Sequence, residues 1–213
     1  MKSLTTKKIA VISLLTAMSV LLSLTIRFPL VPAVPFMHFD PKDLVIAIGG
    51  FIYGPFTAFL ISVFSSLLEE LFTGKTIIDV IMNIISSASF ACTAAWLYRR
   101  IHTKHGAIYS LAAGTGVTII VMLIWNYIMD PFYLHVPRSV VVGLLPAIAL
   151  FNFLKYGIDS VLCFLVYKPV VKALRSAGLV PASEGEHKSS KMNAAIAFAA
   201  LTIAAVLICV FAK

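Results

Sequence analysis

The chain has 213 residues, of which 60% are hydrophobic and only 12% are charged. With a mean hydropathy of +0.99, this composition excludes an ordinary soluble domain and predicts an all-α integral membrane protein built as one compact bundle. The formal net charge of +8 would suggest nucleic acid in a soluble protein, but here most basic residues flank apolar runs. We therefore expect the charge to set membrane topology, and we predict no nucleic-acid partner.

The first apolar run extends from Ile9 to Ile26 and follows Lys2, Lys7 and Lys8. It is long enough to span a bilayer and is not followed by an A-x-A cleavage site. We expect it to be retained as a first transmembrane helix, with the N-terminus in the cytoplasm.

The second apolar run, Leu44 to Leu68, could be one long helix or two short ones broken at Gly54-Pro55. With the break, the basic clusters at Arg99 to Lys104 and Lys168 to Arg175 both fall on the cytoplasmic side, as the positive-inside rule requires. We therefore predict two helices, Asp43 to Tyr53 and Pro55 to Leu71. The first is too short to cross a bilayer alone, so it should be packed inside protein.

Three further apolar segments complete six helices between Ile9 and Leu174: Val80 to Tyr98, Ala107 to Met129, and Ser139 to Leu154, which continues past Lys155 to Tyr167. We expect Asp130-Pro131 to end the fifth, because proline disrupts a helix. Residues 1–181 would form a six-helix domain, residues 182–192 a polar linker, and residues 193–213 an accessory C-terminal transmembrane helix.

Polar side chains recur on three of these helices at a similar depth, in the outer half of the bilayer. A charge at the centre of a membrane helix costs about 2.5–3.5 kcal/mol on insertion scales, so Lys155 should face a cavity or a partner and indicates a functional site. The alternative is an ion pair of Lys155 with Asp159 or Asp79 that only joins helices, and the asparagines could likewise serve interhelical hydrogen bonds. The residues at this depth are Asp79, Asn83, Asn126, Asp130, Asn152, Lys155 and Asp159.

The segment from Phe28 to Asp43 has four prolines, which exclude a regular helix, yet it is apolar and aromatic. We expect it to cover the mouth of a cavity as a lid, with Phe36, Met37 and Phe39 facing inward. His38 and Asp40 are potential metal ligands without a third partner, so we predict no metal site.

Catalytic motifs are not found. The stretch FTGKT resembles the end of a nucleotide-binding loop, but Glu69 stands where its first glycine is required. We expect a binding subunit without its own ATPase, not an enzyme, that needs a partner to drive transport. Two other hypotheses are an intramembrane enzyme using Asp79, Asp159 and Lys155 for proton transfer, and a purely structural subunit.

Four segments in chain order carry a specific resemblance: DPKDLVIAIGGFIYGP, IMNIISSASFACTAAWLY, VMLIWNYIMDPFY and the FNFLKYGID…VYKPVVKAL series. Together they resemble the riboflavin-specific substrate-binding (S) components of energy-coupling factor (ECF) transporters. The resemblance implies a six-helix bundle in the bacterial plasma membrane that captures riboflavin from outside. The partners it implies are membrane lipid, a T component and two cytoplasmic ATPases, with riboflavin as transported ligand and no cofactor. An S component for thiamine, folate, pantothenate or a queuosine base is the alternative.

The resemblance also implies roles for individual residues. Asn126, Asn152 and Lys155 match family positions that contact the flavin, with Asp159 or Asp79 balancing the charge of the lysine. Small residues on the first helix would form a docking face for the T component, although they could instead pack within the bundle. The other candidate riboflavin contacts are Asp40, Lys75 and Asn83, with Phe39, Trp125 and Tyr127 as stacking partners, and the docking residues are Ala10, Ser13 and Ala17.

Overall fold

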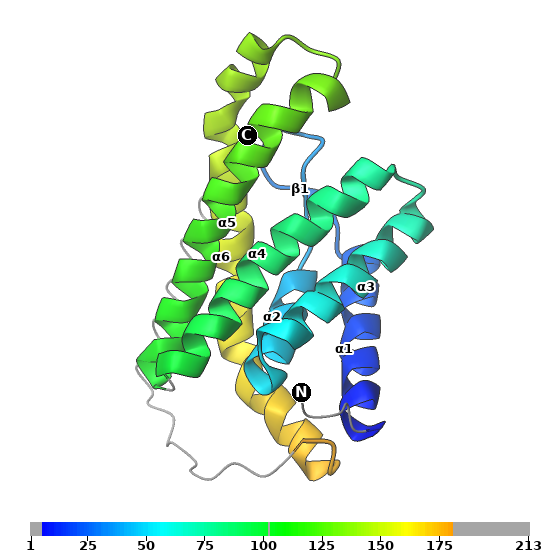
Figure 1. Ribbon diagram of the computed structural model, residues 1–213, viewed down its shortest axis with the longest axis vertical. Coiled ribbons are helices and arrows are strands. Elements are labelled where there is room, and N and C mark those ends of the chain that lie inside the picture. The colour runs from blue at the N-terminus through cyan, green and yellow to red at the C-terminus, as the bar shows by residue number, and fades with distance from the viewer. Residues whose placement is uncertain (1–5, 102, 181–213) are drawn as a thin grey trace.

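The computed structural model describes residues 6–101 and 103–180, which form six helices and one short hairpin. The sequence-predicted six-helix bundle is confirmed (Figure 1). The predicted linker (182–192) and accessory helix (193–213) lie outside the described residues. The elements are α1 (Thr6–Thr25), β1 (Phe28–Pro29), β2 (His38–Phe39), α2 (Lys42–Tyr53), α3 (Pro55–Thr73), α4 (Ile77–Ile101), α5 (Lys104–Tyr133) and α6 (Arg138–Ser176).

The second apolar run is broken as predicted. Helix α2 ends at Tyr53, and α3 begins at Pro55, a residue suited to the first helical position because it has no N–H to leave unpaired. Between them Gly54 has a φ of 99°, a left-handed value that glycine adopts without strain. The turn therefore depends on this glycine.

Helix α2 is the buried centre of the molecule. Every residue from Lys42 to Phe51 is buried, and the helix contacts α1, α3, α4 and α6. The five other helices are long and apolar enough to cross a membrane, whereas α2 is not among them. The short helix is thus enclosed by protein, which is where its backbone and its charged first turn can be tolerated.

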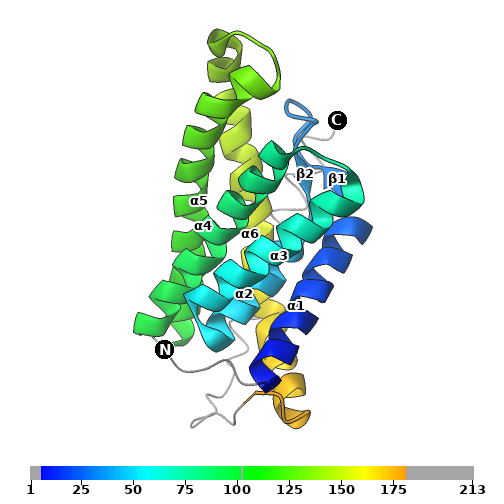
Figure 2. The same cartoon turned by 45° about the vertical axis from the view of Figure 1, so that its right-hand side comes forward.

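Figures 1 and 2 show which loops and turns lie at each of the two ends of the bundle. One end, the rim end, carries the β1–β2 hairpin, the α3–α4 turn and the α5–α6 turn. The opposite end, the basic end, carries the start of α1, the α2–α3 turn, the α4–α5 connection and the end of α6. Basic residues described there are Lys7, Lys8, Arg99, Arg100, Lys168, Lys172 and Arg175.

Three prolines lie inside helices without ending them. Pro131 does not end α5, which continues to Tyr133, where the Leu134 N–H donates to the Asp130 carbonyl at 2.8 Å. Proline removes only its own N–H, and so close to a helix end that loss involves a single backbone bond. Helix α6 likewise runs unbroken for 39 residues through Pro146 and Pro169.

The loop between α1 and α2 is anchored to α6. The hairpin pairs Phe28 with Phe39 and Pro29 with His38. Buried loop side chains join an apolar cluster with Ile148, Phe151 and Leu154 of α6. Each fully buried aliphatic side chain contributes roughly 1.5–3 kcal/mol, so the loop has a fixed place over the rim end. The loop residues in this cluster are Leu30, Val31, Val34, Met37 and Phe39.

Candidate functional site

A pocket opens at the rim end between α3, α4, α5, α6 and the α1–α2 loop. The cavity volume is about 160 Å³, and the pocket is partly open to solvent. Phe36 and Met37 of the loop line it, as the lid hypothesis expects. The described structure thus combines a cavity with a structured cover.

Most of the sequence-predicted site residues meet in this pocket. Phe39, however, lies behind the lining and packs against Phe28 with ring centroids 5.3 Å apart. Tyr127 is 39% exposed and points away from the pocket, with the Arg138 guanidinium 5.1 Å from its ring centroid. The predicted residues that line the pocket are Asp40, Lys75, Asn83, Trp125, Asn126, Asn152 and Lys155.

The inner part of the pocket presents two amides. Asn126 donates from Nδ2 to the Met122 carbonyl at 2.6 Å, and Asn152 donates to the Ile148 carbonyl at 2.8 Å. Both bonds stay within the residue's own helix, and neither amide oxygen accepts a hydrogen bond from the described residues. Because Met122 and Phe151 line the same region, the floor offers acceptors within an apolar surface.

Lys155 is fixed by carboxylates. Its Nζ donates to the Asp40 carbonyl at 2.8 Å and to Asp40 Oδ2 at 3.0 Å, and it lies 3.0 Å from Asp43 Oδ2. The predicted pairing with Asp159 is present at 3.8 Å. Asp159 itself is fully buried and does not line the pocket. Lys155 therefore joins α6 to the loop and to the first turn of α2.

The neighbouring charges shift the pKa values of two loop residues, Asp40 and His38. Burial favours the neutral carboxyl of Asp40, but the ammonium groups of Lys155 and Lys42 outweigh it, and the pKa of Asp40 lies below its ordinary value. Burial, assisted by the Arg27 guanidinium, lowers the pKa of His38, whose Nδ1–H donates to the Phe36 carbonyl at 3.2 Å. Within residues 6–101 and 103–180, no three His, Cys, Asp or Glu side chains are grouped as metal ligands would be.

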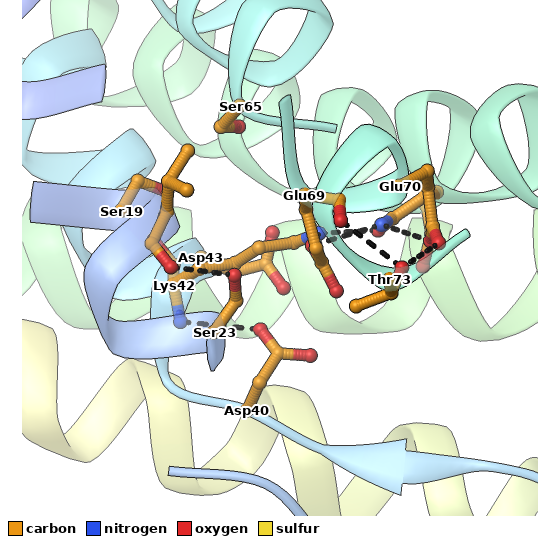
Figure 3. A network of polar contacts seen from close by, with 12 residues as sticks. Ser19, Ser23, Asp40, Lys42, Asp43, Ser65, Glu69, Glu70 and Thr73 are labelled. Atoms are coloured by element: carbon orange, nitrogen blue, oxygen red, sulfur yellow. Dashed lines mark hydrogen bonds and ion pairs between the residues drawn. The ribbon is translucent and has the colours of Figure 1, made fainter. Parts of the chain in front are cut away.

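A second charged network borders the pocket and was not predicted (Figure 3). The buried Lys42 ammonium donates to the Glu69 carboxylate and to Asn83 Oδ1, the latter at 2.5 Å. Asn83 Nδ2 in turn donates to Glu69 at 3.1 Å and to Glu70 at 3.2 Å. Thr73 and Lys75 also bind Glu70, at 2.8 and 3.5 Å. This network joins α2, α3 and α4 at the pocket wall.

The sequence contains one signal that points to this network. Glu69 and Glu70 are adjacent acids inside the apolar helix α3, and buried acids require nearby cations. The sequence-based expectation places Lys42 in the outer loop and Asp43 at the start of a helix, without a partner for either. The same desolvation argument that singled out Lys155 applies to all four residues.

Small residues on α1 remain outside the bundle core. Ala10, Ser13 and Ala17 are all exposed, while Val11 and Leu15 on the other side of α1 are buried. The described contacts therefore leave the small-residue face free, against the alternative that it packs within this bundle.

The sequence is similar to a known protein family and to two of the curated transporters. Residues 7–167 match the family model described as "ECF transporter, substrate-specific component". The chain is 28% identical over 190 residues to the riboflavin transporter FmnP of Bacillus subtilis (strain 168), covering 80% of this chain and 97% of that protein. It is 26% identical over 176 residues to the riboflavin transporter RibU of Staphylococcus aureus (strain TCH60), covering 79% and 93%.

A solved structure matches as well. The S component of a bacterial ECF transporter superposes with a TM-score of 0.67 at 28% identity, over 79% of this chain and 98% of that one. The family match spans most of the described bundle, including every residue that lines the pocket. This chain therefore belongs to the family of substrate-specific components of ECF transporters.

Proposed function

We propose that this chain is the riboflavin-binding S component of an ECF-type importer. Similarity to several riboflavin transporters along about four-fifths of the chain supports this ligand. The resemblance to ECF transporters implies that the proposed importer also contains a T component and two cytoplasmic ATPases, and the family match supports this assembly. Binding by this subunit alone would not accumulate the vitamin.

One structural observation carries the choice of ligand class: the floor of the pocket has free amide oxygens beside apolar side chains. Riboflavin has an uncharged three-ring system with an apolar edge and an edge of N–H and C=O groups. Asn126 and Asn152 can accept from the N–H, while Trp125 and Met122 offer apolar contact to the rings. The Lys155 ammonium is already paired with the carboxylates of Asp40 and Asp43. It is therefore not available as the counter-ion of an anionic ligand, which favours an uncharged one.

The orientation follows from the charged ends. We propose that the rim end faces outward and the basic end faces the cytoplasm, as positive-inside topology favours. The exposed Ala10, Ser13 and Ala17 face of α1 would then dock on the T component, because small side chains allow close helix approach in a membrane.

The first test is the visible absorption spectrum of the detergent-purified chain, followed by titration with riboflavin while flavin fluorescence is recorded. We expect a co-purified flavin spectrum and near-stoichiometric quenching with a Kd in the nanomolar range, about −12 kcal/mol. Folded, monodisperse protein that leaves riboflavin fluorescence unchanged would contradict the proposal.

Competition assays separate the alternatives. Displacement of riboflavin by thiamine, folate or pantothenate at equal concentration would shift the ligand assignment to another vitamin. Chromatography of the bound flavin after prolonged incubation addresses the enzyme hypothesis, and we expect the ligand to be recovered unaltered.

A further inference from the structure

Among the described residues that line the pocket, one carboxylate has no side-chain partner. Asp130 lines the pocket and is only 4% exposed. Its Oδ2 is enclosed whereas its Oδ1 is not, and no described residue forms a side-chain hydrogen bond or ion pair with either oxygen, so Oδ1 is the acceptor that a ligand can reach. Burying an unpaired polar group is unfavourable and uncommon in folded proteins, so this carboxylate calls for an explanation.

The other acids of the same pocket do not share this property. Asp79 accepts from Thr76 Oγ1 at 2.6 Å and from the Tyr133 hydroxyl at 2.8 Å. Glu69 and Glu70 belong to the Lys42 network, and Asp40 is bound by Lys155. Among the pocket-lining carboxylates of the described residues, Asp130 alone has no partner. Helix stability does not need it either, because only its backbone carbonyl takes part in ending α5.

Asp130 lies close to Asn126, which forms part of the proposed flavin-binding floor. Asp130 lies four residues after Asn126, on the same face of α5 and about one turn closer to the rim. A ligand whose ring edge meets Asn126 can direct its remaining substituent from the floor toward the rim. In riboflavin that substituent is the ribityl chain, which bears hydroxyl donors. An ionised carboxylate only accepts hydrogen bonds, and so it is complementary to neighbouring hydroxyls.

We propose that Asp130 accepts hydrogen bonds from the hydroxyl groups of the ligand's polyol chain and thereby selects flavins that carry this chain. The inference rests on the proposed riboflavin function and adds a specificity residue to it. The unpaired state in the ligand-free protein follows naturally, because the missing donors arrive with the ligand. Asp130 then stabilises the complex at the expense of the empty protein.

This role has two separable consequences. A hydrogen bond to a charged acceptor is among the stronger ones, so its removal should lower the affinity for riboflavin by about tenfold or more. The ligand-free protein should behave oppositely, because replacing Asp130 removes a buried unpaired charge. If Asp130 had a merely structural role, its replacement would instead lower the stability of the ligand-free protein.

The test compares two probes, riboflavin and lumiflavin, which has the same three-ring system with a methyl group in place of the polyol chain. We expect Asp130→Ala to weaken riboflavin binding about tenfold or more and lumiflavin binding less than about twofold. Asp130→Asn keeps a neutral acceptor and should give a smaller loss for riboflavin alone. Thermal unfolding of both ligand-free variants should occur at or above the wild-type temperature.

Asp79→Asn is the matched control, since it removes the same charge from the same rim but from a carboxylate that already has partners. It should lower the unfolding temperature and leave the ratio of riboflavin to lumiflavin affinities within about twofold of wild type. An equal shift of that ratio in both variants would mean that rim charge, and not Asp130 as acceptor, sets the preference, and would overturn the inference.

The remaining outcomes are also decisive. The inference is wrong, while the proposed function stands, if wild type binds riboflavin and Asp130→Ala weakens the affinities for riboflavin and lumiflavin by the same factor. The same holds if Asp130→Ala changes neither affinity. If wild type binds neither flavin, the proposed function fails and this inference fails with it. A destabilised ligand-free Asp130→Asn variant would assign the residue a structural role.

Discussion

Lys155 shows that one residue of this site serves both the fold and the pocket. Its ammonium lies among Asp40, Asp43 and Asp159, which belong to the loop, to α2 and to α6. The sequence-based expectation is that Lys155 contacts the flavin directly. In the structure its N–H groups are instead directed at Asp40 and Asp43. Its loss should therefore be felt first in stability.

Substituting Lys155→Met should destabilise the ligand-free protein by about 3–5 kcal/mol, because it leaves buried carboxylates without their cation. Differential scanning fluorimetry in detergent measures the change. The double variant Lys155→Met with Asp43→Asn should recover part of the loss, since it removes one of the stranded charges. Unfolding of the single variant at the wild-type temperature would contradict this account.

Asn152 gives a cleaner test of ligand contact. Asn152→Ala should weaken riboflavin binding at least about fivefold, because it removes a pocket-lining acceptor and leaves a ligand N–H unpaired. Fluorescence titration measures the effect. Phe153→Ala is the control, since Phe153 is 55% exposed on the neighbouring position of α6 and is not part of the pocket lining. Equal Kd values for both variants would remove Asn152 from the site.

At the scale of elements, the α2–α3 break depends on one glycine. Gly54→Ala places a Cβ on a residue with φ of 99°, and its position lies 2.5 Å from the Arg99 guanidinium carbon. We expect a loss of about 1–3 kcal/mol, dominated by backbone strain. Thermal unfolding in detergent checks this value.

Gly116→Ala is the paired control for that variant. A Cβ at Gly116 meets no atom within 4 Å, and the residue has ordinary helical backbone within α5. Its replacement should leave stability unchanged or raise it by up to about 1 kcal/mol. Similar losses for the two glycines would show that the α2–α3 turn is not conformationally demanding.

The exposed face of α1 leads to a prediction about assembly. Ser13→Leu should retain riboflavin binding but reduce ATP-dependent uptake and co-purification with a T component, because a bulky side chain prevents close helix approach. Vesicle uptake and affinity purification measure the two effects. Met18→Leu is the control, because it conserves side-chain volume at another exposed position of α1. Uptake unaffected by Ser13→Leu would argue against docking there.

For the whole molecule, orientation is the property to measure. Single cysteines replacing the exposed Ser139 and Ser176 lie at the rim end and the basic end, with Cys92, Cys163 and Cys209 changed to alanine. We expect a membrane-impermeant maleimide to label the Ser139 position in intact cells and the Ser176 position only after lysis. The reverse pattern would invert the proposed topology.

Much of this molecule was predictable from sequence because the bilayer imposes strict rules on backbone and charge. The six helices, the break at Gly54 and the importance of Lys155 follow from apolar length, proline and glycine chemistry, and desolvation. The network of Lys42, Glu69 and Asn83 did not, because which buried charges meet depends on how α2 is enclosed. The side chain of Tyr127 was likewise misplaced, since helical register relative to the pocket is set by packing.

The length of α6 has a mechanical consequence. At about 1.5 Å per residue it extends roughly 58 Å, nearly twice the thickness of about 30 Å for a hydrocarbon core. Lys155 lies near its middle, about 26 Å from Arg138 and about 32 Å from Ser176. Between Pro146 and Pro169 the helix extends about 14 Å to one side of Lys155 and about 21 Å to the other. A rotation of this stretch by about 10° around Lys155 would displace its two ends by roughly 2–4 Å in opposite directions. A small change of angle at the pocket is thus amplified at both surfaces of the membrane.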